Sequence, residues 1–212
     1  MNYGLPKSVE IDGQDFDIRY DYRAILDIFE AMNDPTSSDE DRALDVLQIF
    51  YVDFDKLANY DEAMKKCFWF INGGEETRAP QKGLHLVDWA MDFHRIIAPV
   101  NRVLGYEARA IDYDVEHNTG GVHWWTILAA YAEIGDCLFA QIVRIRDKRA
   151  KGKPLDKSDR EFYRKNRDII DIKQTYSDAE NDLVSLWTGE KKTAHKGGYS
   201  DGLSCTERLI ST

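Results

Sequence analysis

The first residues of the chain alternate apolar and charged side chains, which is typical of half-buried β-strands. Val9-Glu10-Ile11 and Phe16-Asp17-Ile18 follow this alternation, and Asp12-Gly13 lies between them. Asp-Gly favours a two-residue type I′ turn, because both turn positions need a positive φ angle. We therefore predict a β-hairpin over about residues 7–19, in which Val9 faces Phe16 and Ile11 faces Gln14. A lone hairpin is marginal in water, so its apolar face is expected to pack on helices.

Apolar residues then recur with a helical period as far as about residue 171. Asn72-Gly73-Gly74 and Gly105 are typical helix stops, and Ser37 with Glu40 and Ser158 with Glu161 have capping-box spacing. The predicted helices run over Tyr22–Met32, from Ser37 or Ser38 to about Tyr51, from the N-cap Asp61 to Ile71, over about Leu86–Leu104, from His123 to about Ile134, from the N-cap Asp136 to about Arg149, and from Ser158 past Ile170.

Two of these helices carry specific predictions about burial. The second is expected to bury Leu44, Leu47 and Tyr51 on one face. The fourth is expected to bury a face that includes Ile97 and His94, with His94 as a hydrogen-bonded core histidine. Pro99 lies inside this fourth helix and is expected to kink or split it.

The pattern as a whole predicts a mainly α fold. We expect a helical bundle of about six to seven helices, with a small N-terminal β-hairpin and a flexible C-terminal tail. Residues 1–173 are predicted to form a single helical domain. Residues 174–212 have little to bury, so we expect a mobile tail in which one short helix, over about 177–187, is possible. The polar stretches at 75–83 and 106–120 are predicted to be loops.

Composition narrows the class of protein further. The chain has 212 residues and is 43% hydrophobic, which suits one compact domain with a buried core. It contains no run of about 18 apolar residues, so we expect no membrane span, and its N-terminus lacks the features of a signal peptide. The three cysteines are scattered, so Cys67 and Cys137 are expected to be buried, reduced thiols rather than a disulfide or zinc site.

The net charge of −10 is distributed unevenly. In residues 1–141, 12 Lys/Arg and 26 Asp/Glu give −14, whereas in residues 142–173, 12 Lys/Arg and 6 Asp/Glu give +6. An acidic body argues against nucleic acid as a partner. The basic segment is either a solvated helix face that complements the acidic body or a surface that docks on an acidic partner or on another copy.

The sequence contains no strong pattern for catalysis or cofactor binding. It lacks a phosphate-binding glycine loop, a nucleophile-elbow serine and the paired histidines of a helical zinc site. The best metal candidate is His85 with Asp88 and Asp92, which share one side of a helix. A solvated acidic helix face explains the same spacing, so the prediction is a protein that is not an enzyme and has no cofactor and no metal.

Aromatic residues cluster at Phe68-Trp69-Phe70 and His123-Trp124-Trp125. Neighbouring side chains on a helix point in different directions, so one can lie in the core while the next reaches the surface. Helix packing is the simpler explanation, but aromatic residues also dominate binding hot spots. The candidate partner interface consists of Trp69, Trp124, Trp125, Arg144, Arg146, Arg149, Tyr163 and Arg164.

Several of these segments follow one another in a characteristic order. They are Leu5-Pro6 with the hairpin at 9–13, Cys67–Gly74, His123-Trp124-Trp125, Ile142–Arg146 and Glu161–Asn166. In this order they resemble the bacteriophage gene-product-fifteen family of long-tailed phages, over about residues 3–171. The His-Trp-Trp and Phe-Tyr-Arg-Lys segments are the most specific parts of the resemblance. Residues 172–212 carry no recognised pattern.

The resemblance implies a phage or prophage protein of the tail module that works in the bacterial host cytoplasm. Genes of this family lie just before the tape-measure gene, where tail assembly chaperones are usually encoded. We therefore expect a chaperone that binds the tape-measure protein and has no nucleic-acid or membrane partner. The tail tube protein and further copies of this chain are additional candidate partners. The alternatives are a structural tail or tail-connecting component of the virion, an acidic inhibitor of a host protein, and a metal-dependent enzyme that uses Asp88 and Asp92.

Overall fold

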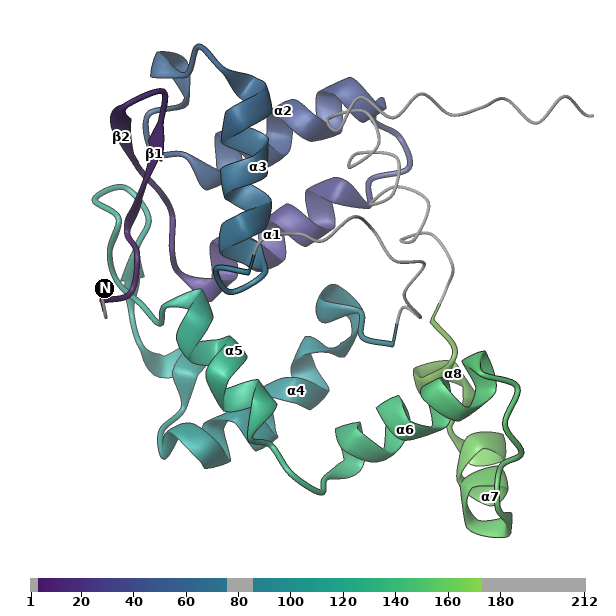
Figure 1. Ribbon diagram of the computed structural model, residues 1–212. Coiled ribbons are helices and arrows are strands. Elements are labelled where there is room, and N and C mark those ends of the chain that lie inside the picture. Colours follow the sequence, from purple (N-terminus) through teal and green to yellow (C-terminus); the bar gives the residue numbers. More distant parts are fainter. Residues whose placement is uncertain (1–3, 76–85, 173–212) are drawn as a thin grey trace, which may run out of the picture.

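The computed structural model describes residues 4–75 and 86–172 (Figure 1). These residues form eight α-helices, two two-stranded sheets and two short 3₁₀ helices. The elements in chain order are β1 (Ser8–Ile11), β2 (Gln14–Asp17), α1 (Tyr22–Met32), α2 (Asp39–Phe50), η1 (Phe54–Lys56), α3 (Tyr60–Ile71), α4 (Trp89–Leu104), η2 (Ala108–Ala110), β3 (Tyr113–Asp114), β4 (Thr119–Gly120), α5 (Trp124–Ala132), α6 (Leu138–Ala150), α7 (Lys157–Lys165) and α8 (Arg167–Ile170). The predicted mainly α class with a small N-terminal hairpin is confirmed. The predicted tail at 174–212 and nearly all of the predicted loop at 75–83 lie outside the described residues.

The N-terminal hairpin has the predicted register. β1 and β2 pair antiparallel, with Val9 opposite Phe16 and Ile11 opposite Gln14. Asp12 and Gly13 have φ angles of 50° and 82°, as a type I′ turn requires. Val9, Ile11 and Phe16 are buried, so the apolar face of the hairpin packs on the helical core as expected.

Helix α1 has the predicted bounds, but α2 differs from the prediction in its buried face. Ser38 caps α2 by accepting a hydrogen bond from the Asp41 amide at 3.1 Å, so the helix begins at Asp39. Leu47 and Tyr51 are buried as predicted, whereas Leu44 is 37% exposed. The prediction for Leu44 was wrong because the face that meets the core is made by Ala43, Val46, Leu47 and Phe50.

The prediction for the buried face of α4 was right for Ile97, which is buried, but wrong for His94. His94 is exposed, and the residues buried by α4 are Asp92, Ile96, Ile97 and Val100. The helix is continuous across Pro99, so it is not split, and it ends at Gly105, whose φ of 78° suits a glycine cap. The buried face of α4 thus includes a charged residue, Asp92, which a purely apolar pattern cannot reveal.

The C-terminal helices show three further differences from the sequence pattern. Cys137 rather than Asp136 caps α6, through an Ala140 amide that lies 3.4 Å from its sulfur. This position leaves Cys137 half-buried, while Cys67 is buried as predicted and burial raises the pKa of its thiol. The predicted seventh helix is two helices, α7 and α8, separated at Asn166, and Asp156 rather than Ser158 caps α7. The predicted loop at 106–120 contains η2 and the short β3–β4 hairpin.

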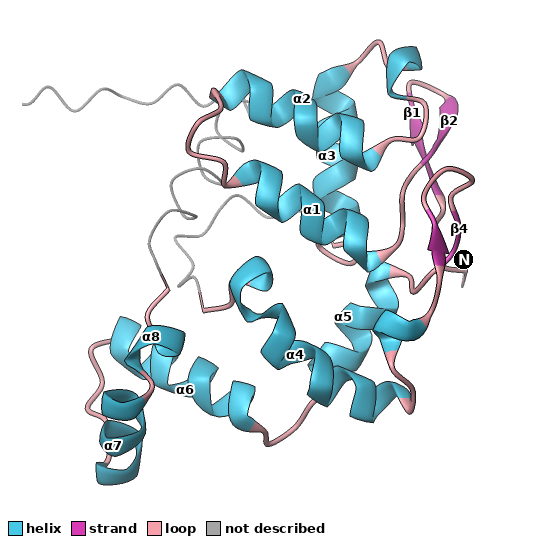
Figure 2. Cartoon of the chain, turned by 180° about the vertical axis from the view of Figure 1, so that it is seen from behind, coloured by secondary structure: helices cyan, strands magenta, loops and turns pink. Residues whose placement is uncertain are grey.

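The elements form three groups along the molecule (Figures 1 and 2). The N-terminal hairpin and α1–α3 lie at one end, and α1 and α2 pack against each other. Helices α4 and α5 lie in the middle, and α6, α7 and α8 form a separate lobe at the other end, which contacts α4. We call α6–α8 the C-terminal lobe. Within residues 4–75 and 86–172, none of the helices has the length and apolar composition needed to cross a bilayer.

Candidate interaction surfaces

Aromatic residues gather where the end of α3 meets the start of α5. The indole N–H of Trp124 donates to the carbonyl oxygen of Ile71 at 2.8 Å, and that of Trp125 donates to the carbonyl of Phe70 at 2.7 Å. The last carbonyls of a helix have no partner within the helix, so these two indoles satisfy the C-terminal end of α3. The Trp69 and Trp125 rings meet edge to face, with centroids 5.4 Å apart.

The three tryptophans of the predicted interface differ in their burial. Trp124 is 1% exposed and contacts Phe29 and Trp89, so it belongs to the core and is removed from the predicted interface. Trp69 and Trp125 are half-buried and lie side by side, which leaves them as surface candidates. Gly74 is required beside them, because a Cβ atom there would lie 2.7 Å from the Trp125 ring.

His123 joins this aromatic cluster to the N-terminal segment. Its Nδ1 atom accepts a hydrogen bond from the Trp125 amide at 3.0 Å and so caps α5, while Nε2 donates to the carbonyl of Pro6 at 2.8 Å. This pattern of one acceptor and one donor requires a neutral imidazole. Burial lowers the pKa of His123 below its ordinary value of 6.5.

The lowered pKa predicts how His123 couples stability to pH. The unfolded chain binds a proton at His123 more readily than the folded chain, so the free energy of unfolding should fall as pH drops below about 6.5. The decline should end below the pKa of the folded state. In His123→Asn, which retains a good N-cap residue, this component should disappear from urea titrations at a series of pH values. His94→Asn, at an exposed position on α4, should keep the wild-type pH dependence; an unchanged profile in His123→Asn would refute the coupling.

The C-terminal lobe is fixed to the body by a buried ion pair. Arg146 of α6 donates to both carboxylate oxygens of Asp92 on α4, at 2.6 and 3.0 Å. Its other donated hydrogen bonds go to the carbonyl oxygens of Leu86, Ile169 and Ile170, at 2.9, 2.9 and 2.7 Å. The Arg146 and Asp92 side chains are only 4% and 0% exposed. Arg146 is therefore a structural residue that joins α4, α6 and α8, and it is removed from the predicted interface.

Most of the other basic residues of α6 pair within the lobe. Arg144 and Lys148 bind the Asp159 carboxylate of α7 at 3.1 and 2.6 Å, and these cations hold the pKa of Asp159 below its ordinary value. Arg149 stacks over the Tyr163 ring at 4.2 Å and forms an ion pair with Asp171. The excess of positive charge at 142–173 is thus used largely to hold α6, α7 and α8 together.

The outward face of α7 is different, because its cations are exposed. Lys157, Arg160, Arg164 and Lys165 share one side of this helix, opposite Asp159, and all four are exposed. Within the described part of the chain none of the four forms an ion pair. Of the predicted basic residues, Arg164 is therefore the one that the structure leaves free on the surface, and it lies on what we call the basic face of α7.

The two carboxylates of the predicted metal candidate already have structural roles. Asp88 caps α4 by accepting from the Met91 amide at 2.8 Å, and Asp92 accepts from the Asp88 amide and from Arg146. His85 lies outside the described residues. Among residues 4–75 and 86–172, no group of three or more His, Cys, Asp or Glu side chains is placed to hold a metal ion.

A groove between α1, α2 and the β3–β4 hairpin was not predicted from the sequence. It has a volume of about 700 Å³ and is lined by Arg19, Arg23, Ala24, Asp27, Ala31, Asp45, Gln48, Ile49, Tyr113 and Val115. Val115, near the tip of the hairpin, is 59% exposed. Its charged lining consists of two arginines, Arg19 and Arg23, and two aspartates, Asp27 and Asp45, and we call it the α1–α2 groove. Arg19 donates to carbonyls at the end of α2 and Arg23 pairs with Asp21, whereas Asp27 and Asp45 are exposed. The groove is formed by segments about 90 residues apart in the chain, so no local pattern could have indicated it.

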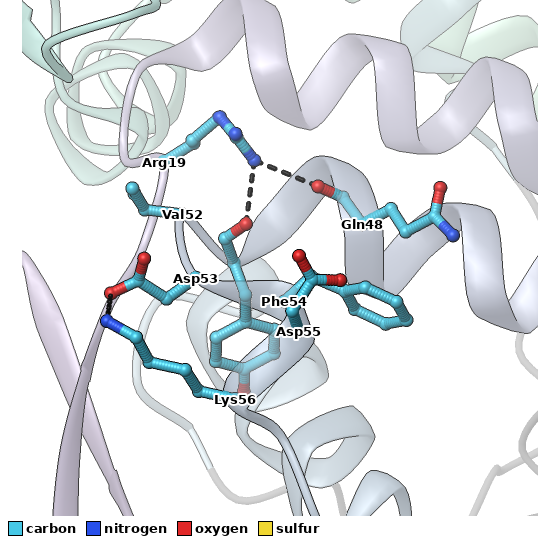
Figure 3. A pocket seen from close by; sticks show the side chains of 8 residues that line it. Arg19, Gln48, Val52, Asp53, Phe54, Asp55 and Lys56 are labelled. Atoms are coloured by element: carbon cyan, nitrogen blue, oxygen red, sulfur yellow. Dashed lines mark hydrogen bonds and ion pairs between the residues drawn. The ribbon is translucent and has the colours of Figure 1, made fainter.

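A smaller recess of about 480 Å³ lies at the end of α2, where Arg19 is also found (Figure 3). The guanidinium of Arg19 points to the last carbonyls of α2 and donates to Gln48, Ile49 and Tyr51 at 2.8–2.9 Å. On its other side, Lys56 pairs with Asp53 at 2.7 Å. Arg19 therefore caps the end of α2, and Lys56 and Asp53 pair with each other, so these groups have structural roles.

The fold and these surfaces define a mainly helical protein with an N-terminal hairpin and a basic C-terminal lobe. A family model described as "Bacteriophage Gp15 protein" matches residues 1–97, which span the hairpin, α1–α3 and the first half of α4. Residues 1–97 of this chain are thus similar to the bacteriophage Gp15 family. No curated protein and no solved structure matches the chain. The match ends before the His-Trp-Trp and Phe-Tyr-Arg-Lys segments, so the wider resemblance to residue 171 stays a prediction.

Proposed function

We propose that this phage protein is a tail assembly chaperone, which binds the tape-measure protein in the host cytoplasm and keeps it soluble until the tail tube protein replaces it. The observation that carries the proposal is the match of residues 1–97 to the Gp15 family. The position usual for genes of this family, directly before the tape-measure gene, supplies the identity of the client.

Physical features of the structure support such a role. A chain with a net charge of −10 is favoured to remain soluble at high copy number. The half-buried Trp69 and Trp125 rings, which lie side by side, present aromatic area of the kind that dominates protein interfaces. A long apolar helix, such as a tape-measure protein contains, would find a contact surface there.

Co-expression with the tape-measure protein encoded in the same phage genome tests the proposal. We expect the tape-measure protein to become soluble and to purify with several copies of this chain, as measured by affinity purification and mass determination. The Trp69→Ala/Trp125→Ala variant should recover less client. Tyr106→Ala, which removes a ring that is 43% exposed away from the Trp69–Trp125 pair, is the matched control. A client that stays insoluble while this protein purifies alone would contradict the chaperone function.

A further inference from the structure

The α1–α2 groove is bordered by carboxylates that have no cationic partner among residues 4–75 and 86–172. Asp27 and Asp45 line it from α1 and α2. Glu30 lies one turn from Asp27 on α1 and Asp41 lies one turn from Asp45 on α2, while Glu40 is on the neighbouring side of α2; all five are exposed. Within the described residues none of the five forms an ion pair. Leu44 lies among them on the α2 face and is 37% exposed, so the surface has an apolar contact as well as negative charge.

The basic face of α7 has the opposite character. Arg160 and Arg164 lie one turn apart on this face, with Lys157 and Lys165 beside them. Helix α7 is held rigidly from behind, because Asp159 binds Arg144 and Lys148, and Tyr163 packs under Arg149. The four cations are therefore presented on a preformed, fixed helix, which reduces the entropy lost when a partner binds.

These two complementary surfaces lie at opposite ends of the molecule. Figures 1 and 2 agree that α7 projects from the C-terminal lobe at the end farthest from α2. The lobe is fixed by the buried Arg146–Asp92 pair, so α7 cannot reach the α1–α2 groove of its own chain. A second copy, however, brings the same α7 face with it.

We propose that the basic face of α7 of one copy docks on the α1–α2 groove of a second copy. Arg160 and Arg164 approach Asp27 and Asp45, and Leu44 lies against the docked helix. The contact joins two different surfaces, so in a pair one copy keeps its groove free and the other keeps its α7 free, and further copies can add at both ends. This inference goes beyond the proposed function and does not depend on it, because it concerns the chain alone.

Charge reversal in the full-length chain, without a client, tests the proposal. Arg160→Glu/Arg164→Glu and Asp27→Lys/Asp45→Lys should each raise the dissociation constant for self-association at least about tenfold, since each brings like charges together. Mixing the two variants should restore association, because each then offers the surface that the other lacks. Sedimentation velocity at low salt measures this, and added salt should weaken the wild-type contact.

A control separates the specific contact from net charge. Lys65→Glu/Lys66→Glu on α3 changes the charge of the chain by the same amount as the α7 variant and should leave association unchanged. Wild-type chain that stays monomeric at low salt would overturn the proposal. Failure of the mixed variants to associate, or a control variant that dissociates like the α7 variant, would overturn it as well. Circular dichroism of each variant verifies that it is folded.

Discussion

Replacing Arg146 with alanine is expected to lower the free energy of unfolding by about 3–5 kcal/mol, the largest effect of any single substitution in the C-terminal lobe. The change leaves the carboxylate of Asp92 buried without its cation, since Asp92 is fully buried and Arg146 supplies two of its hydrogen bonds. It also removes donors from the carbonyls of Leu86, Ile169 and Ile170. Denaturant titration measures the loss, and amide hydrogen exchange should show that α6 and α8 open first.

Two companion variants identify the cause. Arg144→Ala, two residues earlier on the same helix, removes a side chain that is 55% exposed and should cost less than about 1 kcal/mol. The double variant Arg146→Met/Asp92→Leu removes both charges together and should recover the part of the loss that comes from the unpaired Asp92 carboxylate, while the part that comes from the carbonyls of Leu86, Ile169 and Ile170 remains. If Arg146→Ala costs no more than Arg144→Ala, the ion pair does not fix the lobe.

Gly121→Ala is expected to be the second large effect, with a loss of roughly 2–5 kcal/mol from a single methyl group. Gly121 has a φ angle of 70°, which L-residues rarely adopt, and a Cβ atom there would overlap the Oδ2 atom of Asp21. Asp21 cannot move aside without loss, because it is fully buried and accepts hydrogen bonds from the amides of Val122 and Arg23 at 2.6 and 2.9 Å. Thermal or denaturant unfolding measures the change.

Gly135→Ala is the matched control for Gly121→Ala. Gly135 also has a positive φ angle, of 59°, but a Cβ atom there would meet nothing within 4 Å. It should therefore show only the backbone cost of about 1–2 kcal/mol. Equal losses in the two variants would mean that the contact with Asp21 adds nothing.

The sequence predicted those elements whose signals are local. The hairpin register follows from Asp12-Gly13 and the alternation on either side of it, and it is confirmed. Helix α1 is confirmed residue by residue, because its apolar face and its stop lie within about a dozen positions of one another. In both cases the determining residues are sequence neighbours, so tertiary packing does not change the outcome.

The errors occur where a distant residue decides the structure. Helix α4 turns Asp92 rather than His94 inward because Arg146, 54 residues later, binds Asp92. The same contact makes Arg146 a core residue although it lies in a charged segment. Trp124 and Trp125 satisfy carbonyls of α3 from more than 50 residues away, which the pattern at 123–125 does not indicate. The α1–α2 groove depends on a hairpin that joins from far along the chain, so it was missed entirely.

The placement of the tryptophans makes intrinsic fluorescence a probe of one particular region of the molecule. The Trp69 and Trp125 rings lie 5.4 Å apart and the Trp89 and Trp124 rings 4.9 Å apart, all where α3, α4 and α5 meet. The remaining tryptophan of the chain is at position 187, so residues 138–172 contain none. Emission from the four clustered indoles therefore reports the opening of that junction, while detachment of the C-terminal lobe leaves the emission unchanged until α4 itself moves.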